Sequence, residues 1–373
     1  MKTKFVWLPL IFLILGIAIG SGITWYLLKS KQDSETNTSV DSGTDETPEA
    51  ESPREYSLDK EVSVYLVWWD QDNGFKNLKK YKNLISTVHP FWYQINSDGS
   101  ISKFSGAEDE EIIEFCKTNN IQIIPVISNE QNPEPVRSII NDKTATDSHI
   151  SDIMQLVNDN GYDGIEIDYE NLEADDRTNY STFLTDLSNE IHQNSKLLTT
   201  AVHAKTADEG SWGGPAAQDW TVINNTCDRV KVMTYDYHWS TSEAGDIAPI
   251  SWMEEVLDYA LTVLNQDKIQ LGIHFYGYDW QGKNGKDLTY TDVLDIQESN
   301  DIGQIMTTTE EEKYFIYDDE GEKHTVYFAD NEVVRPRIEL ANKYDIAGIG
   351  IWRIGQEDEL NWTQIEDIFN RPV

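Results

Sequence analysis

The chain has 373 residues, 39% hydrophobic and 11% aromatic, and its 29 basic and 66 acidic side chains give a formal charge of −37. This apolar content suffices for a sizeable core and excludes global disorder. The charge argues against nucleic-acid backbones and anionic membrane surfaces as partners, because their phosphates would be repelled. A neutral or cationic ligand remains, and the 12 Trp and 18 Tyr residues suit stacking on flat ligand faces such as those of sugars.

An uncharged apolar stretch, residues 5–28, lies near the start of the sequence with lysines on both flanks. About 20 apolar residues cross a bilayer, whereas the apolar core of a cleaved signal peptide has roughly 7–15. We therefore predict a membrane anchor over 1–31, with a cleaved signal peptide as the alternative. Residues 32–55 are acidic and rich in Ser, Thr and Pro, which predicts a disordered linker. With an anchor, the expected location is the cell membrane, crossed once, with residues 56–373 outside the cell. With a cleaved signal peptide, the protein would be secreted.

From residue 56 onward, short β-branched runs alternate with amphipathic helical patterns. The runs are 62–69, 84–95, 121–128, 164–170, 197–204, 230–237, 269–278 and 346–354. Eight strands alternating with helices predict a (β/α)8 TIM barrel. An open doubly wound sheet is the alternative, but no glycine-rich phosphate-binding turn follows any run. The tract 281–333 between the last two runs predicts a small α+β insertion before the final strand.

The sharpest chemical feature is a row of three acids, Glu166, Asp168 and Glu170, in the fourth run. Alternate side chains of a strand point to the same face, so the three carboxylates share one face of the predicted sheet. Crowding of three carboxylates raises the pKa of each one and lowers the stability of the fold. A strand with a purely structural role would not need three acids on one face.

Position within the predicted barrel favours a catalytic role for this row. Barrel active sites lie at the C-terminal ends of the strands, so Glu170, the last of the three, is the candidate general acid. The alternatives are an exposed acidic edge strand and a Mg²⁺ or Ca²⁺ site. We predict no metal and no cofactor, because no second acidic cluster of similar quality occurs.

The residues DGIEIDYE at 163–170 resemble the D-x-x-D-x-D-x-E strand of family 18 glycoside hydrolases, the chitinase-like hydrolases. Three further segments resemble the family in the expected order: MTYDYHW at 233–239, GIHFYGYDW at 272–280 and GIGIWRIGQED at 348–358. The resemblance covers roughly residues 60–370. It is strongest to the bacterial subgroup of spore-cortex and peptidoglycan N-acetylglucosaminidases.

The resemblance implies a retaining, substrate-assisted hydrolysis of β-1,4-linked N-acetylglucosamine glycans, either chitin-like or peptidoglycan. In this mechanism the 2-acetamido oxygen of the sugar attacks the anomeric carbon in place of a protein nucleophile. Glu170 would protonate the leaving oxygen and then activate water, and Asp168 would orient the acetamido group. Tyr235 would hydrogen-bond the acetamido carbonyl, while Asp236 and Trp352 would contact the sugar.

One position departs from the family pattern, because residue 166 is Glu where the family has Asp. The extra methylene moves the carboxylate by about 1.5 Å, which bears on the proton relay between Asp168 and this residue. Glu166 and Tyr93 complete the predicted substrate-binding set. Like its aromatic neighbours near the ends of the first two strands, Tyr93 could stack on a sugar or pack in the core.

Two other functions stay open at this point. A catalytically silent glycan-binding barrel would keep the fold and the aromatic residues without turnover. A metal-dependent hydrolase would use the same acids. The expected partners are a polysaccharide that contains N-acetylglucosamine and, through the N-terminal helix, a membrane. We expect no nucleic-acid partner and a monomer.

Overall fold

The computed structural model describes residues 58–370, so the predicted anchor at 1–31 and the predicted linker at 32–55 lie outside the described residues. Within 58–370, no helix is both long and apolar enough to cross a bilayer. The described chain forms a closed barrel of parallel strands. The eight barrel strands are β1 (Glu61–Val67), β2 (Thr87–Ile95), β5 (Val126–Ser128), β6 (Gly164–Asp168), β7 (Leu197–His203), β8 (Arg229–Met233), β9 (Ile269–His274) and β15 (Gly348–Trp352).

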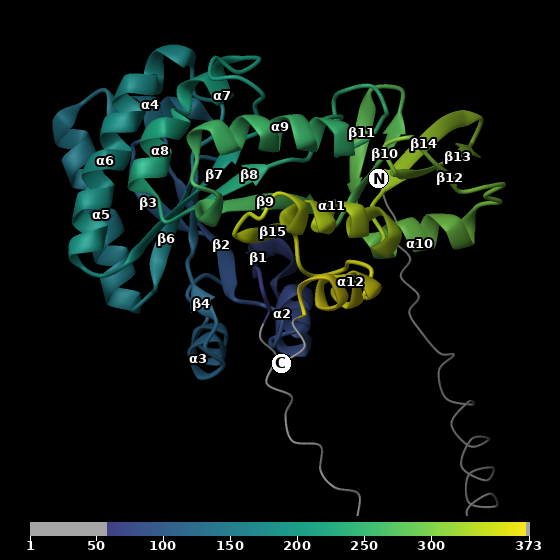
Figure 1. Cartoon of the computed structure of the whole chain (residues 1–373), viewed down its shortest axis with the longest axis horizontal. Helices are drawn as coiled ribbons and strands as arrows, with labels where there is room; N and C mark the ends of the chain where they lie inside the picture. The colour runs from purple at the N-terminus through teal and green to yellow at the C-terminus, as the bar shows by residue number, and fades with distance from the viewer. Residues whose placement is uncertain (1–57, 371–373) are drawn as a thin grey trace, which may run out of the picture. The chain divides into compact units, whose positions relative to one another are not determined.

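Closure follows from the pairing of β1, which is hydrogen-bonded to β15 on one side and to β2 on the other. Each of the eight predicted runs contains one barrel strand, so the (β/α)8 prediction is confirmed (Figure 1). The third run divides into β4 (Gln122–Ile123) and β5, because Pro125 has no N–H to donate to a sheet ladder. A short strand, β3 (Ile101–Lys103), extends β2 as an antiparallel partner.

Helices cover the outside of the strands (Figure 1). They are α2 (Gln71–Lys80), α3 (Glu110–Thr118), α4 (Pro133–Ile140), α5 (Lys143–Asn160), α6 (Arg177–Gln193), α7 (Gly213–Ala217), α8 (Trp220–Thr226), α9 (Ile250–Val263), α11 (Asn331–Lys343) and α12 (Leu360–Phe369), with short 3₁₀ turns η1 (Trp68–Asp70), η2 (Ala174–Asp176) and η3 (Gln266–Lys268). Aspartates begin several of them: the side chains of Asp109, Asp142, Asp219 and Asp330 accept N–H groups of the first turn. These caps satisfy donors that have no partner inside the helix.

The insertion before the last barrel strand is a separate antiparallel sheet with one helix, and it lies to one side of the barrel in Figure 1. Its strands are β10 (Gly277–Gln281), β11 (Asn284–Leu288), β12 (Met306–Thr307), β13 (Lys313–Asp319) and β14 (Glu322–Phe328), and its helix is α10 (Tyr290–Ser299). Leu288, Val293, Phe315, Val326 and Phe328 form its core. The sheet begins at Gly277, inside the seventh predicted run, so the insertion starts earlier than the predicted residue 281.

A buried ion cluster joins this insertion to the barrel. Glu312, on the loop before β13, accepts a hydrogen bond from Arg337 of α11 at 3.0 Å and lies 2.9 Å from His274 Nε2 at the end of β9. All three side chains have no exposed surface. Breaking such a pair would leave a buried charge without compensation, so the cluster fixes the insertion against the end of β9.

Close backbone approach between barrel strands requires glycine at two places. A Cβ atom on Gly348 of β15 would lie 2.0 Å from the carbonyl oxygen of Glu61, and one on Gly164 of β6 would lie 2.2 Å from that of Leu197. Both contacts involve backbone atoms, which cannot rotate away.

We therefore expect Gly348→Ala to lower the free energy of unfolding by roughly 1–3 kcal/mol, the usual cost of overpacking. Gly303→Ala is the matched control, because no atom lies within 4 Å of the added Cβ, and it should change stability by less than about 0.5 kcal/mol. Chemical denaturation of the three proteins measures both values. Equal stability of the two variants would contradict the close-approach argument.

Candidate active site

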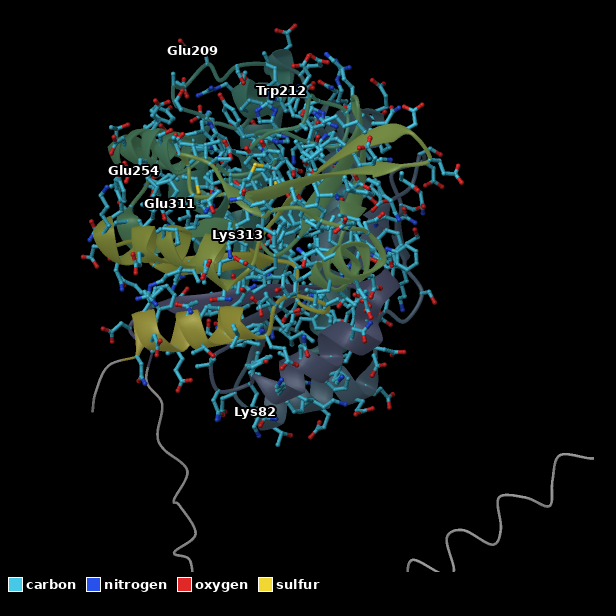
Figure 2. The ribbon with its side chains drawn as sticks, turned by 90° about the vertical axis from the view of Figure 1, so that its right-hand side faces the viewer. Lys82, Glu209, Trp212, Glu254, Glu311 and Lys313 are labelled. Carbon is cyan, nitrogen blue, oxygen red and sulfur yellow. The ribbon has the colours of Figure 1, made fainter. Side chains whose placement is uncertain are left out.

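The three acids of β6 form a row that runs from the barrel interior to its mouth. Glu166 has no exposed surface, Asp168 at the end of β6 is 6% exposed, and the Glu170 side chain just beyond the strand is 18% exposed. The row therefore opens at the C-terminal ends of the strands. In the view of Figure 2, Trp212, which follows β7, lies near the top of the molecule and Lys82, which precedes β2, near the bottom.

The backbone of Glu170 is held by one buried side chain, that of Asn129 directly after β5. Asn129 Oδ1 accepts the Glu170 N–H at 2.9 Å, and Asn129 Nδ2 donates to the Glu170 carbonyl at 2.8 Å. The next residue, Asn171, has a φ of 58°, in the left-handed region. Asn129 thus fixes where the strand ends and the turn begins. No pattern in the sequence predicted this role, since an Asn after a strand is common in any loop.

Burial and the negative charge of Asp236 raise the pKa of Glu170 to about 7. The Nε2 atom of His203 on β7 lies 3.8 Å from Glu170 Oε2. This nitrogen accepts the Asn171 N–H at 3.4 Å, and burial lowers the pKa of His203 to about 4. The imidazole is therefore neutral near pH 7 and does not form an ion pair with Glu170, which is left able to hold a proton.

Asp168 is the member of the row without a compensating partner. Its Oδ1 is buried and has no hydrogen-bond partner within residues 58–370. Burial, followed by the charges of Glu170, Glu166 and Glu130, raises its pKa well above the usual range. Burial of this kind favours the neutral acid over the carboxylate.

Glu166 is closed off by protein donors, which corrects the prediction that it contacts substrate. Its Oε1 accepts the hydroxyl proton of Tyr65 from β1, and its Oε2 accepts hydrogen bonds from Thr199 of β7, at 2.7 Å, and from Lys231 of β8. Burial tends to raise the pKa of Glu166, but the charges of His89 and Lys231 and the hydrogen bonds from Lys231 and Tyr65 hold it at about 2. With no exposed surface, the carboxylate is unavailable to a ligand.

Lys231 is the cation that balances Glu166. His89 Nδ1 also lies 3.4 Å from Glu166, but burial lowers the pKa of His89 to about 3, and the same nitrogen lies 2.9 Å from the Ile124 carbonyl, to which it donates. Sequence reasoning missed Lys231, although a lysine between two valines in a predicted buried strand was a visible signal.

Tyr235 and Asp236 follow β8 and lie on the other side of the row. Gly272 of β9 leaves room for Tyr235, because a Cβ there would lie 2.9 Å from its ring. Burial and the charge of Asp168 raise the pKa of Tyr235 well above its usual value, so the phenol keeps its proton and can donate it in a hydrogen bond. Asp236 is exposed, and its Oδ1 accepts hydrogen bonds from the hydroxyls of Tyr276 and, at 3.0 Å, Tyr278.

Trp352, the last residue of β15, belongs to an aromatic wall beside the acids. Its ring centroid lies 5.1 Å from that of Tyr65, 5.7 Å from that of Phe91 and 6.5 Å from that of Trp69. Trp69 is 50% exposed. The wall therefore offers an apolar surface at the mouth of the barrel. It also contacts the ring of Tyr65, whose hydroxyl donates to Glu166.

Tyr93 is not part of this wall, and its predicted substrate contact is corrected. It has no exposed surface, and its hydroxyl bonds to Tyr162 at 2.8 Å and to Glu108 at 2.9 Å. Strand alternation would put Tyr93 on the same face as Phe91. The pairing of β2 with β5 shifts register between these two residues, and such an irregularity changes the side-chain alternation. Tyr93 consequently packs in the core.

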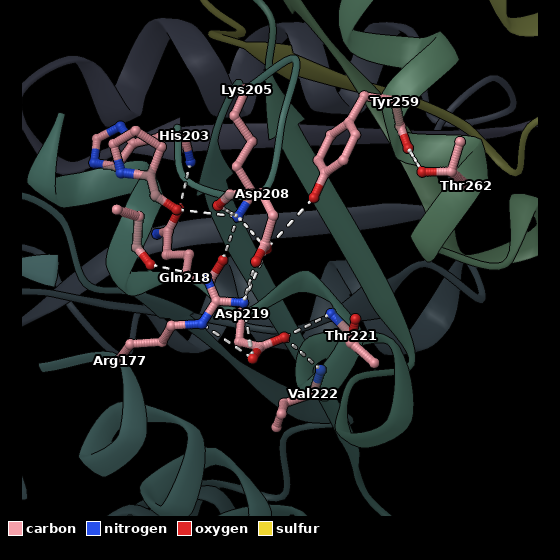
Figure 3. Close-up of polar contacts among 12 residues, drawn as sticks. Arg177, His203, Lys205, Asp208, Gln218, Asp219, Thr221, Val222, Tyr259 and Thr262 are labelled. Carbon is pink, nitrogen blue, oxygen red and sulfur yellow. Dashed lines mark hydrogen bonds and ion pairs between the residues drawn. The ribbon is translucent and has the colours of Figure 1, made fainter. Parts of the chain in front are cut away.

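The segment after β7 folds over the opposite side of the mouth. Lys205 Nζ donates to the carbonyls of Asp208, Pro215 and Gln218 at 3.1, 3.1 and 2.7 Å. Arg177 of α6 bridges the carboxylates of Asp208 and Asp219, which Figure 3 shows around the same loop.

This network holds Trp212, which is 48% exposed and lies with its ring 4.7 Å from that of His203. The loop thus places a second aromatic surface near Glu170, across the barrel mouth from the β1 and β15 wall. Within residues 58–370, no group of three or more acidic, His or Cys side chains has the arrangement needed to hold a metal ion.

Comparisons with curated proteins agree with this geometry. The chain is 26% identical over 310 residues to the uncharacterized glycosylase YvbX of Bacillus subtilis, covering 78% of this chain and 87% of that protein. It is 27% identical over 269 residues to the cortical fragment-lytic enzyme of the same organism, covering 69% of this chain and 62% of that enzyme.

Solved structures show the same fold. A chitinase from Chromobacterium violaceum superposes with a TM-score of 0.76 at 23% identity, covering 82% of this chain and 98% of the other. The spore cortex-lytic enzyme SleL of Bacillus cereus gives 0.75 at 23% identity, covering 83% and 74%. The sequence model of the family Glycosyl hydrolases family 18 matches residues 61–357. This range includes the acid row, Tyr235, Asp236 and Trp352. The chain therefore belongs to family 18 of the glycosyl hydrolases and is a glycosidase.

Proposed function

We propose that this glycosidase cleaves β-1,4-linked N-acetylglucosamine glycans with retention of configuration, and that Glu170 is its general acid and base. The observation that carries the proposal is the Glu170 carboxyl at the mouth of the barrel, fixed by Asn129 and next to the buried Asp168. Its raised pKa suits an acid that must hold a proton near neutral pH and give it up in the transition state.

In the first step, the acetamido oxygen of the sugar attacks its own anomeric carbon while the bond from that carbon to the leaving oxygen breaks. Glu170 gives its proton to the leaving oxygen and becomes a carboxylate. Asp168 faces the acetamido group, and Tyr235 donates a hydrogen bond to its carbonyl oxygen. In the second step, Glu170 takes a proton from water as the water oxygen attacks the anomeric carbon, which restores the acetamido group and the protonated acid.

The surroundings of Asp236 support the sugar as its own nucleophile. Asp236 is the other carboxylate whose charge acts on Glu170, so it is the rival nucleophile. Two tyrosine hydroxyls donate to its Oδ1, and lone pairs engaged in this way are less available to attack carbon. We assign Asp236 to sugar binding, together with Trp352 as an apolar surface under the ring.

The substrate class rests on the relatives. Their names include chitinases and enzymes that act on spore cortex. We propose that this chain likewise takes a chitin-like or peptidoglycan glycan, because the aromatic surfaces at Trp69, Trp352 and Trp212 suit stacked sugar rings.

Replacing Glu170 with Gln tests the proposal. Glu170→Gln keeps the shape of the side chain but removes the transferable proton, so kcat on an N-acetylglucosamine oligomer should fall by at least ~10²-fold while glycan binding persists. Glu190→Gln, the same chemical change on the exposed side of α6, is the control and should retain activity. Turnover by Glu170→Gln within a few-fold of the unchanged protein would reject Glu170 as the acid.

We further propose that the chain acts at the outer face of a membrane, held by the apolar residues 5–28, which lie outside the described residues. The whole chain should sediment with membranes, whereas a chain that starts at Tyr56 should remain in the soluble fraction. Fractionation followed by immunoblotting measures both. A whole chain of full mass in the soluble fraction would count against an anchor.

A further inference from the structure

A buried ion pair lies inside the barrel, below the residues that face the sugar. Lys231 of β8 has a side chain that is 3% exposed, and Glu166 of β6 has none exposed. Within residues 58–370, Glu166 is the hydrogen-bond and ion-pair partner of the Lys231 ammonium. Moving two such charges out of water is costly unless each fully compensates the other, so the pair needs a reason beyond stability.

The barrel leaves space for this lysine. A Cβ atom on Gly350 of β15 would lie 3.4 Å from both Cγ and Cδ of Lys231. The aliphatic stem therefore runs along a glycine, where a larger residue would crowd it. The tip of the stem reaches Glu166, which also receives Tyr65 and Thr199.

Three protein donors engage the carboxylate of Glu166. One oxygen accepts from Tyr65, and the other accepts from both Thr199 and Lys231. A carboxylate has about four acceptor positions, so these three donors occupy most of them, and His89 Nδ1 lies 3.4 Å from the same Oε2 atom. Asp168, two residues along the same face, has a buried oxygen without a partner.

We propose that Lys231 is a positioning residue that keeps Glu166 ionised, which leaves Asp168 as the member of the row that holds a proton beside Glu170. This inference rests on the proposed function for its role in hydrolysis. It assigns the extra length of Glu166 a purpose, since the longer side chain reaches the lysine and the hydroxyls on three other strands. Lys231 itself contacts no substrate.

Lys231 acts on Asp168 directly and on Glu170 through Asp168. The positive charge of Lys231 acts on Asp168 against the larger effect of burial, whereas Glu170 responds to its burial and to Asp236. Titratable side chains from most of the barrel strands face the row. They are Tyr65 from β1, His89 from β2, Glu130 after β5, His203 from β7, Lys231, Tyr235 and Asp236 from β8 and its loop, and Tyr276 after β9. The charges of Glu61 and Arg229, at the starts of β1 and β8, act on Lys231. Apart from Lys231, none of those that face Asp168 is a cation near neutral pH.

The test uses two variants that differ in one charge. Glu166→Gln leaves the Lys231 cation without its counter-ion, so Asp168 should lose its proton and supply the missing negative charge. The double variant Glu166→Gln with Lys231→Met removes both charges, so Asp168 should be protonated again. Replacing a buried ion pair with neutral groups of similar size is often tolerated, and thermal unfolding checks that both variants are folded.

The first readout needs no turnover. In protein labelled with ¹³C at the aspartate carboxyl carbons, with Asp168→Asn to identify the resonance, Asp168 should be neutral at pH 7 in the unchanged protein, ionised in Glu166→Gln and neutral again in the double variant. If its ionisation state is the same in all three proteins, the proposal is overturned, whatever the activity.

The second readout is the pH dependence of kcat. Glu170 must be protonated to act, and its pKa is raised, so activity of the unchanged protein should be present below about pH 7 and lost as the pH rises through that value. An ionised Asp168 would make Glu170 harder to ionise, so this limb should move upward by roughly 1 pH unit in Glu166→Gln and return in the double variant. A limb at one pH in all three contradicts the proposal, and an inactive unchanged protein rejects the proposed function instead.

Discussion

The desolvation of three carboxylates on one strand face is the constraint on which the site depends. Glu166 and Asp168 of β6 and Glu170, two residues after the strand, lie in one row, and barrel closure removes water from the first two. Each acid meets this constraint differently. Glu166 is paired with Lys231, burial raises the pKa of Asp168 well above its usual range, and Glu170 lies at the mouth with a pKa raised to about 7. The deepest acid is therefore a buried carboxylate, and the outermost acid is the one that can exchange a proton near neutral pH.

Residues from the rest of the barrel hold these three acids in place. Tyr65 and Thr199 bring hydroxyls to the deepest acid from β1 and β7. Asn129 fixes the backbone at the outermost one. The insertion contributes as well, because Tyr278 of β10 donates to Asp236, and the Glu312 cluster holds that sheet against the end of β9. Residues from distant parts of the sequence therefore set the protonation of one short strand.

Sequence reasoning recovered the barrel because each strand is a short β-branched run between helices, a pattern that local chemistry determines. It also predicted roles for Glu170, Asp168, Tyr235 and Asp236, which the structure places at or just after the ends of β6 and β8, and those roles stay predictions. It failed where tertiary contacts decide. Tyr93 turns into the core at a register shift between β2 and β5, and no alternation rule predicts such a shift.

Two further failures have the same origin. Glu166 looked like a ligand contact because its partners, above all Lys231, come from strands far away in sequence. The insertion began earlier than predicted because β9 and β10 form one continuous apolar run, broken only by the change from the barrel to the second sheet. In each case the local pattern was correct, and the neighbour that determined the outcome was not visible in it.

The central claim, that the acetamido group of the sugar is the nucleophile and Glu170 the acid, is tested most directly by the configuration of the first product. Proton NMR of an N-acetylglucosamine oligomer during the first turnovers, before mutarotation, should show the β anomer, and a fully deacetylated oligomer should not be cleaved because the attacking oxygen is missing. An initial α anomer, or cleavage of the deacetylated oligomer at a comparable rate, would contradict the account.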